Sequence, residues 1–172
     1  MSWSRILACA AGLSLTGSLG GCFQPLYSEA AHPGLVADLH SIEVAPVKDR
    51  IGHYLVEDLI ADLNGTGTTA SPPKYRLTVT ISTGTQTPTV NSEINVASSA
   101  TITGEATYSL TKADGGAEVL KGSAEAAAAY DRSTQRYADL RAARDAEIRI
   151  ARALSSEISQ RLASELAAKR AS

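Results

Sequence analysis

The sequence contains little cysteine, few aromatic residues and no surplus of positive charge. Its 172 residues include 2 cysteines, 1 tryptophan, 1 phenylalanine and 6 tyrosines, and 16 basic residues stand against 18 acidic ones. Proteins that bind nucleic acid normally show a basic surplus or a basic stripe, so this balance argues against a nucleic-acid partner. The low aromatic content predicts a core assembled from many small contacts, or one completed by a partner.

The amino-terminal segment lacks an apolar run long enough to cross a membrane. One positive charge, Arg5, precedes a short apolar stretch from Ile6 to Leu15, and small residues lead from there to Cys22. A spanning helix needs roughly 20 apolar residues. A charged start, a short apolar core and small residues before the cleavage point are typical of a secretory signal peptide. We therefore expect residues 1–21 to be a signal peptide that is removed on export.

The two cysteines differ in their expected fates. Cys9 lies inside the predicted signal peptide, whereas Cys22 would begin the mature chain. The segment Leu19-Gly20-Gly21-Cys22 resembles the bacterial lipobox, which implies that the thiol of Cys22 receives a diacylglyceryl group and its new amine is acylated. Two or more acyl chains hold a protein stably on a membrane. A single blocked cysteine permits no disulfide and no cysteine metal site. The alternative is a plain signal peptide followed by a chance cysteine.

The sequence also lacks the motifs of common catalytic and metal sites. Its histidines, His32, His40 and His53, show no ligand spacing such as His-x₃-His, and we interpret them as structural or surface residues. No Gly-x-Ser-x-Gly elbow and no glycine-rich phosphate-binding loop occurs. We therefore expect no catalytic residues, no metal and no cofactor.

Hydrophobic periodicity predicts the order strand–helix–strand–strand–strand–helix. Alternation of apolar and polar residues predicts strands over residues 39–47, 75–82, 94–110 and 117–130, and a helical period predicts helices over 50–63 and about 137–168. Asp49 is the expected N-cap of the first helix, and Asn64-Gly65 its stop. Residues 84–92 are expected to form a polar connection, Gly104 to mark a bulge and residues 114–116 a hairpin turn. The run Ala124–Ala129 could be helical by propensity, but the hairpin favours a strand.

The last predicted helix has one apolar stripe. Its expected members are Leu140, Ala143, Ala151, Leu154, Ile158, Leu162 and Leu166, with Tyr137 and Ile148 at the edge. Arg144 and Glu147 interrupt the stripe three residues apart and are expected to pair. Arg149, Arg152, Ser156 and Gln160 lie on the opposite side. One face of this helix should therefore pack, while the rest meets water or a partner.

These elements predict an α+β fold, a two-layer sandwich in which two helices cover one face of a mixed sheet of about four strands. The first crossover should be parallel and right-handed, and the remaining strands an antiparallel meander. Threonine and serine line the other sheet face, which could remain wet or abut a polar surface such as the lumen of a β-barrel. Residues 22–38 are interpreted as a linker and residues 39–172 as one domain.

The segment after Cys22 carries a further resemblance. Phe23-Gln24-Pro25-Leu26-Tyr27 is similar to the Gly-Cys-Gly-Phe-x-Pro-Leu-Tyr opening of the LptE family of lipopolysaccharide-assembly lipoproteins, although the glycine that often follows the cysteine is absent. Residues 50–55, 75–77 and 129–138 also fit the family pattern. The resemblance implies a lipid-anchored protein on the periplasmic side of the outer membrane. There it would plug and help assemble an LptD-like β-barrel and take part in lipopolysaccharide transport to the cell surface.

Four arginines gather where the last strand passes into the last helix: Arg132, Arg136, Arg141 and Arg144. Arginine binds phosphate through two parallel hydrogen bonds, and lipid A carries phosphates. Our hypothesis is that this cluster contacts lipopolysaccharide or acidic groups on the barrel wall. The alternative is a solvated helix face with Asp131, Asp139 and Asp145 as counterions.

Leu26 and Tyr27 are candidate partner contacts, or else they seal the edge of the domain. Two other functions remain open on the sequence alone. One is an auxiliary lipoprotein of an ABC-type lipid-transport system, which would associate with inner-membrane transporter subunits. The other is a tethered periplasmic hydrolase, which would need a concave site holding a nucleophile and a base.

Overall fold

The computed structural model describes residues 32–65, 72–87, 90–91, 96–97 and 99–171. The predicted signal peptide and the candidate residues Cys22, Leu26 and Tyr27 lie outside the described residues. Nothing in the structure therefore bears on the lipidation site or on the family-like pentapeptide.

The main sheet is mixed and has four strands in the order β1-β2-β5-β6. Its strands are β1 (Ile42–Val44), β2 (Tyr75–Gln86), β5 (Ser99–Lys112) and β6 (Glu118–Asp131). β1 runs parallel to β2, whereas β2, β5 and β6 form an antiparallel meander. Two short strands, β3 (Val90–Asn91) and β4 (Val96–Ala97), pair with each other in a separate ladder. The predicted parallel crossover and meander are confirmed.

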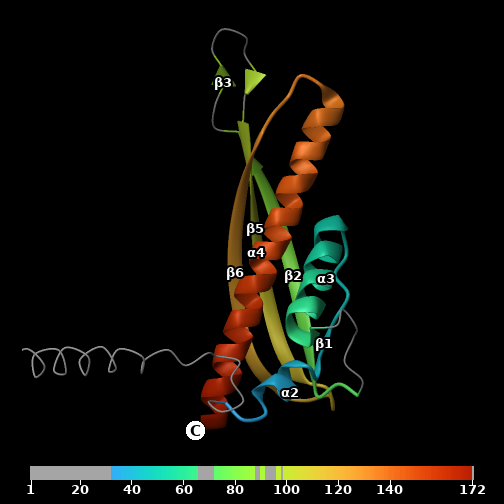
Figure 1. Cartoon of the computed structure of the whole chain (residues 1–172), viewed down its shortest axis with the longest axis vertical. Helices are drawn as coiled ribbons and strands as arrows, with labels where there is room; N and C mark the ends of the chain where they lie inside the picture. The colour runs from blue at the N-terminus through green and yellow to red at the C-terminus, as the bar shows by residue number, and fades with distance from the viewer. Residues whose placement is uncertain (1–31, 66–71, 88–89, 92–95, 98, 172) are drawn as a thin grey trace, which may run out of the picture.

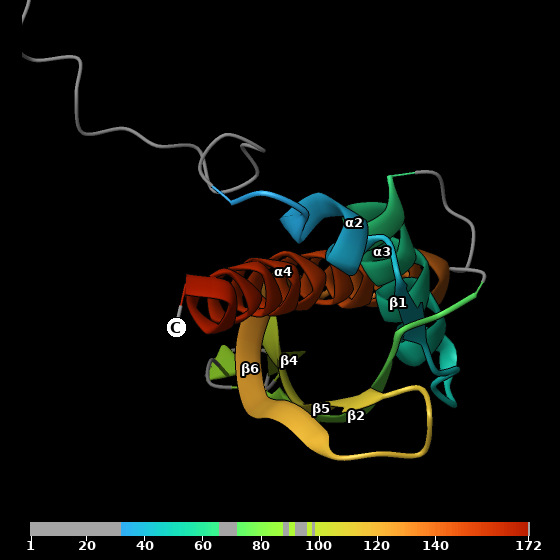
Figure 2. The ribbon, with the colours of Figure 1, turned by 90° about the horizontal axis from the view of Figure 1, so that it is seen from below.

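The helices cover one face of this sheet. They are the short α2 (Leu35–Leu39), α3 (Arg50–Asn64) and the long α4 (Arg136–Ala171). Figure 1 shows α3 and α4 in front of the sheet, with α2 at the base near the end of α4. Seen along the long axis, the sheet curves so that β6 lies beside α4 and β1 lies beside α3 (Figure 2). The fold is the α+β two-layer sandwich that the sequence predicts. No helix in the described ranges is both long and apolar enough to traverse a bilayer.

The core lies between the two layers. The inward positions of the strands alternate with exposed ones, as a period of two requires, and the apolar stripes of the helices pack on them. The strand side of the core includes Leu77, Val79, Ile102, Ala106, Tyr108, Leu110, Ala124 and Ala128, and the helix side includes Leu55, Leu59, Leu63, Ile150, Leu154, Ile158 and Leu162. Burial of one Leu or Ile side chain contributes about 1.5–3 kcal/mol, so these contacts hold the helices on the sheet.

Three strands differ from the sequence prediction in where they begin or end. β2 continues through Gly84 to Gln86, where we expected a polar connection, and β5 begins at Ser99 rather than at residue 94. The first strand shortens to Ile42–Val44. Threonine occupies both faces of β2 at its far end, so the apolar–polar alternation that marks a strand is missing there. The strand prediction for Ala124–Ala129, in contrast, is confirmed.

Gly104 does not mark a bulge. The pairing runs without interruption through Thr83, Gly104 and Ala126, and the register shift lies between Leu110 and Thr111 instead. A Cβ atom on Gly104 would come within 2.7 Å of Cγ2 of Ile150 on α4. The glycine is thus required for the close approach of helix to sheet, a role that strand glycines also fill. The turn at Asp114-Gly115-Gly116 is as predicted, with Gly115 at φ 87°.

The packed stripe of α4 is shorter than predicted. Leu154, Ile158, Leu162 and Leu166 are buried, but Leu140 is 60% exposed and Tyr137 is 75% exposed. Figure 1 shows α4 running well past the start of α3, so its first turns have no second helix beside them. The apolar stripe continues along the helix, but the neighbour that would bury it ends earlier.

Two further expectations are corrected at the start of α3. Glu147 does not pair with Arg144. It accepts two hydrogen bonds from Arg50, from Nε at 2.9 Å and from Nη2 at 2.8 Å. Asp49 holds the N-cap position, but its side chain makes no capping hydrogen bond and its backbone has φ 78° and ψ 160°. α2 also lies within the segment interpreted as a linker, and Leu35 and Leu39 are buried in the core.

Candidate binding surfaces

The predicted arginines lie together at one end of the molecule. Arg136, Arg141 and Arg144 are exposed on the first turns of α4, and Arg132 is exposed just before it. At 100° per residue, Arg136, Tyr137, Leu140, Arg141 and Arg144 fall within an arc of roughly 140°. We call these five residues the α4 tip patch. Each apolar or aromatic side chain of the patch has guanidinium groups beside it.

Two of the predicted counterions pair with arginines outside the α4 tip patch. Asp139 lies 3.8 Å from Nε of Arg132, and Asp145 accepts a hydrogen bond of 2.9 Å from Nε of Arg149. Arg136, Arg141 and Arg144 form no ion pair with any of the residues that the structure describes. The α4 tip patch therefore carries three uncompensated cations next to exposed apolar surface.

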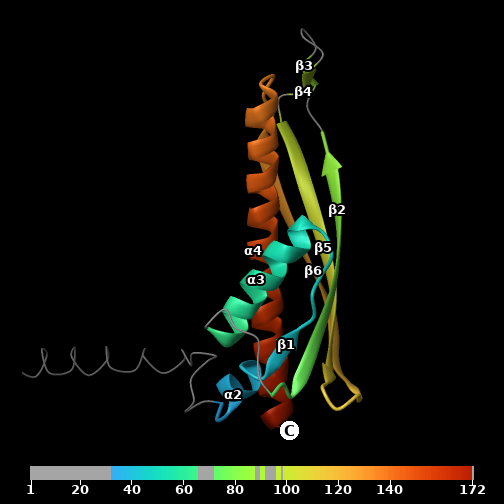
Figure 3. The same cartoon turned by 90° about the vertical axis from the view of Figure 1, so that its right-hand side faces the viewer.

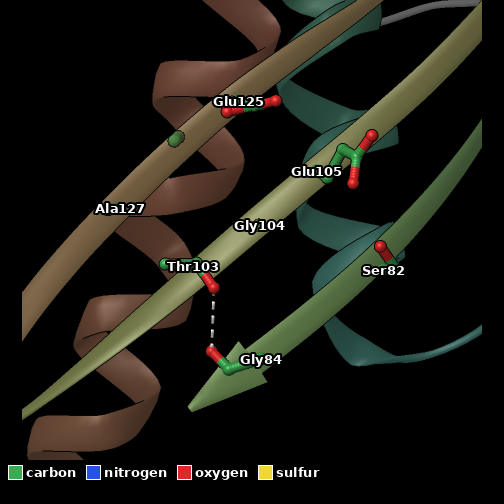
Figure 4. Close-up of a pocket in the computed structure, with 8 residues that line it drawn as sticks. Ser82, Gly84, Thr103, Gly104, Glu105, Glu125 and Ala127 are labelled. Carbon is green, nitrogen blue, oxygen red and sulfur yellow. Dashed lines mark hydrogen bonds between the residues drawn. The ribbon is translucent and has the colours of Figure 1, made fainter. Parts of the chain in front are cut away.

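The outer face of the sheet is polar, as predicted. Its side chains are mostly threonine and serine, and they include Thr78, Thr80, Ser82, Thr101, Thr103, Thr107, Ser109 and Thr111. A shallow depression of about 410 Å³ lies in this face between β2, β5 and β6, beside Gly84, which has no side chain to fill it (Figure 4). Glu105 and Glu125 pair directly across two strands at its rim. Like charges in that position oppose each other.

The interface between α3 and α4 contains the titratable groups with shifted pKa values. The hydrogen bond that Arg50 donates to Glu147 raises the pKa of the Arg50 guanidinium. Burial raises the pKa of Asp58, and nearby Arg152 opposes that rise. Asp62 accepts a hydrogen bond of 2.6 Å from Oγ of Ser155, which is fully buried. These groups join two helices.

Of the three histidines, His40 and His53 are exposed and His32 is partly buried. His53 lies 3.2 Å from Glu57, one turn further along the exposed side of α3. No group of three or more histidine, cysteine, aspartate or glutamate side chains comes together as metal ligands among the residues described.

The base of the molecule is held by one buried carboxylate. Asp38 of α2 is 8% exposed and accepts a hydrogen bond of 3.2 Å from Nζ of Lys74. It also forms an ion pair with Arg170 in the last turn of α4. Its backbone oxygen accepts a hydrogen bond of 2.6 Å from Oγ of Ser41. Asp38 thus connects the first described helix to the last.

The two edges of the sheet present different surfaces. On β6, the backbone oxygen of Ala129 accepts a hydrogen bond of 2.9 Å from Arg149, and those of Ser123 and Val119 accept hydrogen bonds from Arg161 and Lys169. All three donors belong to α4. On the other side, β1 covers β2 only from Tyr75 to Leu77. Beyond that point β2 is the edge of the sheet.

Several solved structures are similar to this fold. A predicted lipoprotein from Caulobacter crescentus CB15 is similar at TM-score 0.65 and 28% identity, over 78% of this chain and 96% of the other. A minor lipoprotein from Acinetobacter baumannii matches at TM-score 0.57 and 13% identity, over 73% and 92%. The rare lipoprotein B from Shewanella oneidensis gives TM-score 0.49 at 12% identity, over 76% and 95%; this likeness is too low to carry weight.

Neither protein-family models nor curated proteins match the sequence. The similarity therefore rests on solved structures. The Acinetobacter protein, at 13% identity, supports the fold alone, whereas the Caulobacter protein shares 28% of its residues with this chain. The fold is thus one that proteins described as lipoproteins adopt.

Sequence reasoning located the arginines but missed two features of these surfaces. The exposure of Tyr137 and Leu140 could not be predicted from the helical period, because it depends on where α3 begins beside α4. The open edge of β2 could not be read either, because the far half of that strand was predicted as a connection. Residues 80–85 are Thr, Ile, Ser, Thr, Gly and Thr, and the β-branched residues among them favour a strand. They are the signal from which the longer strand could have been predicted.

Proposed function

We propose that this chain is an outer-membrane lipoprotein of the LptE type, anchored through Cys22. It plugs and helps assemble an LptD-like β-barrel and takes part in the transport of lipopolysaccharide to the cell surface. The observation that carries the proposal is a lipobox followed at once by Phe23-Gln24-Pro25-Leu26-Tyr27, on a chain whose fold resembles a Caulobacter lipoprotein at 28% identity. The role is one of binding and assembly, without catalysis.

The outer sheet face supports a fit against a barrel wall. A barrel lumen is polar, and side chains of threonine and serine can exchange hydrogen bonds with such a wall at little desolvation cost. The sheet and α4 extend along one axis (Figure 3). Leu26 and Tyr27, which would lie between the lipid anchor and the domain, are proposed contacts with the same partner.

The α4 tip patch supports contact with an amphiphile that carries phosphates. Arg136, Arg141 and Arg144 supply guanidinium groups without counterions among the described residues, and Tyr137 and Leu140 supply apolar surface beside them. Guanidinium binds phosphate through parallel hydrogen bonds, and exposed tyrosine suits a boundary between apolar and wet regions. We propose that this patch and Arg132 meet the lipid A part of lipopolysaccharide.

Affinity purification of the full chain from detergent-solubilised envelopes tests the main proposal. We expect a large β-barrel protein to copurify in a stable 1:1 complex, and mass spectrometry to find an acylated Cys22 at the mature amino terminus. In a Cys22→Ser variant the chain should leave the membrane fraction. Copurification of inner-membrane transporter subunits instead would point to the auxiliary lipoprotein of an ABC-type system, and an unmodified amino terminus would refute the anchor.

A second experiment tests the α4 tip patch by lipopolysaccharide binding. Each charge-assisted hydrogen bond contributes about 1.5–3 kcal/mol, and 1.4 kcal/mol corresponds to about tenfold in affinity. The double variant Arg136→Gln and Arg141→Gln should therefore bind lipopolysaccharide at least about tenfold more weakly. The matched control is Arg152→Gln with Lys121→Gln, which removes the same charge from exposed positions outside the patch. Equal loss in both variants would show a nonspecific charge effect and contradict the role of the patch.

A further inference from the structure

The far half of β2 has backbone groups that point to an open edge. Ala45 donates a hydrogen bond of 2.8 Å to the backbone oxygen of Leu77, so Leu77 faces the β1 side. Because successive residues of a strand point their backbone groups to opposite sides, Ile81, Thr83 and Thr85 face that side too. No described residue forms a hydrogen bond with the backbone groups of these three that face the edge.

Within the part of the chain that the structure describes, the usual protections of a sheet edge are missing along the far half of β2. Natural proteins protect edges with charged residues, prolines, bulges or a covering element. From Thr78 to Gln86 the strand contains no charged residue and no proline, and its pairing with β5 has no register shift. Figure 3 shows β2 continuing beyond the start of α3. At the opposite edge, by contrast, α4 donates side-chain hydrogen bonds to β6.

A pocket adjoins this edge on the helix side. It has a volume of about 250 Å³ and is lined by Ile81, Thr83 and Thr85 of β2, by Ile102 of β5, by Glu147 of α4, and by residues 49–51 at the start of α3. Its apolar lining consists of Ile51, Ile81 and Ile102, which we call its floor. Sites for small molecules usually exceed about 300 Å³, so this volume suits one or two side chains of a peptide.

The rim of the pocket is negatively charged. Arg50 is held by Glu147 through two hydrogen bonds, which leaves the carboxylate of Asp49 without an ion pair or hydrogen bond among the described residues. Asp49 also holds a backbone conformation, φ 78° and ψ 160°, that costs a non-glycine residue about 1–3 kcal/mol. Such strain is commonly found where a ligand is gripped.

From these observations we propose that the β2 edge binds an extended polypeptide segment of another protein as an added strand. The segment pairs with the backbone groups of Ile81, Thr83 and Thr85. It places one apolar side chain in the pocket and, two residues away, a lysine or arginine beside Asp49. Strand addition of this kind takes affinity from main-chain hydrogen bonds and specificity from pockets for alternate side chains.

The charge of the rim decides between a foreign segment and a second copy of this chain. If β2 paired with β2 of another copy, that strand would offer no cation between Thr78 and Gln86, and Asp49 would stay uncompensated. A strand from another protein that carries an apolar residue and, two positions away, a basic residue would place the first against the apolar floor and the second beside Asp49. The inference does not depend on lipopolysaccharide transport, and it can hold or fail independently of the proposed function.

The test uses the full lipoprotein in detergent and a fluorescent, end-blocked peptide of sequence Thr-Thr-Val-Thr-Lys-Thr-Thr. Binding is measured by fluorescence anisotropy. The matched control peptide has N-methyl groups on the backbone nitrogens of Val and Lys, which keeps the side chains and removes the strand-forming N–H groups. We expect the parent peptide to bind and the methylated peptide to bind at least about tenfold more weakly, since two hydrogen bonds of about 0.5–1.5 kcal/mol each are lost.

Two protein variants locate the site. Thr83→Pro removes an N–H group that faces the open edge and should abolish binding, whereas Ala127→Pro, at the corresponding kind of position on the β6 edge, should not affect it. Asp49→Asn should lower the affinity for the lysine peptide about threefold to fivefold, because the charge pair is removed. The affinity for a peptide with norleucine in place of lysine should not change.

Several outcomes would overturn the inference. Absence of binding up to about 1 mM peptide would do so, as would equal affinity for the methylated peptide, which would indicate an apolar or detergent site. Self-association of the chain that Thr83→Pro removes, without any peptide binding, would identify a second copy as the occupant. The methylated-peptide comparison uses the wild-type chain and stands even where a proline variant fails to fold.

Discussion

The two edges of the sheet differ in how their backbone groups are treated. Along β6, the oxygens of Val119, Ser123 and Ala129 accept hydrogen bonds from basic side chains of α4. Along the far half of β2 the corresponding groups have no partner among the described residues. Exposed edges are sites of unwanted pairing. One edge is thus closed by the molecule itself, and the other is left available.

The difference arises from where the helices run. α4 follows β6 for most of its length, so that Arg149, Arg161 and Lys169 each reach the strand. α3 is less than half as long, at 15 residues against 36, and it starts beside the middle of β2 (Figure 3). Helix length and placement therefore decide which edge is protected.

The largest expected effect comes from loosening the helix that protects β6. Leu154 is fully buried between α4 and the sheet, and Leu154→Ala should reduce the free energy of unfolding by about 2–5 kcal/mol. Hydrogen exchange should show greater loss of protection in β6 than in β2. Leu140→Ala, on an exposed turn of the same helix, is the control and should change stability by less than about 0.5 kcal/mol. Uniform loss across all strands would contradict a link between α4 packing and the β6 edge.

A smaller effect is expected from widening the contact between α4 and β5. Gly104→Ala introduces a Cβ within 2.7 Å of Ile150 and should cost about 1–3 kcal/mol, as overpacking of a core does. The measurement is chemical denaturation. Gly84→Ala is the matched change on β2, where the nearest atom is the hydroxyl of Thr103 at 3.3 Å, and it should cost less. If Gly84→Ala lowered the free energy of unfolding more than Gly104→Ala, α4 would be able to shift away from the sheet more easily than its packing indicates.

The pair of glycines also shows what the sequence can and cannot disclose. Periodicity predicted the four strands of the main sheet and the two longer helices, and the Asp-Gly-Gly residues predicted the turn at 114–116, because these features depend on neighbours in the chain. It misread Gly104 as a bulge, since the reason for that glycine is Ile150, far away in sequence. The arginines of the α4 tip patch were located from their positions at the start of the last predicted helix. Their lack of counterions became visible only once Asp139 and Asp145 were seen to pair with other arginines.

Removing the donors of the β6 edge should have a moderate effect. Arg149→Ala and Arg161→Ala each remove a side-chain hydrogen bond to a β6 oxygen, and each should cost about 0.5–1.5 kcal/mol. The double variant should also aggregate faster on mild heating, because its second edge becomes open. Arg141→Ala, which makes no ion pair among the described residues, serves as the control in light scattering. Unchanged aggregation in the double variant would argue that the donors do not guard the edge.

The smallest effect on stability is expected when a charge is placed at the open edge. Thr83→Lys puts an ammonium group next to Asp49 and Glu147 in the pocket, and the free energy of unfolding should change by less than about 0.5 kcal/mol. The same variant should block the added peptide, because its own side chain occupies the site. Thr80→Lys, whose side chain lies on the outer face, should leave both stability and peptide binding unchanged. Peptide binding to Thr83→Lys at wild-type affinity would place the peptide elsewhere.

Asp38 gives the base of the molecule a mechanical property. It joins α2, where the chain enters the domain, to Arg170 near the end of α4 and to Lys74 before β2. A tension applied through the segment that precedes α2 would therefore be shared at once by the first and last helices, instead of peeling one short element from the surface. The domain would therefore resist such a force as one unit, because the carboxylate of Asp38 links its first and last described helices.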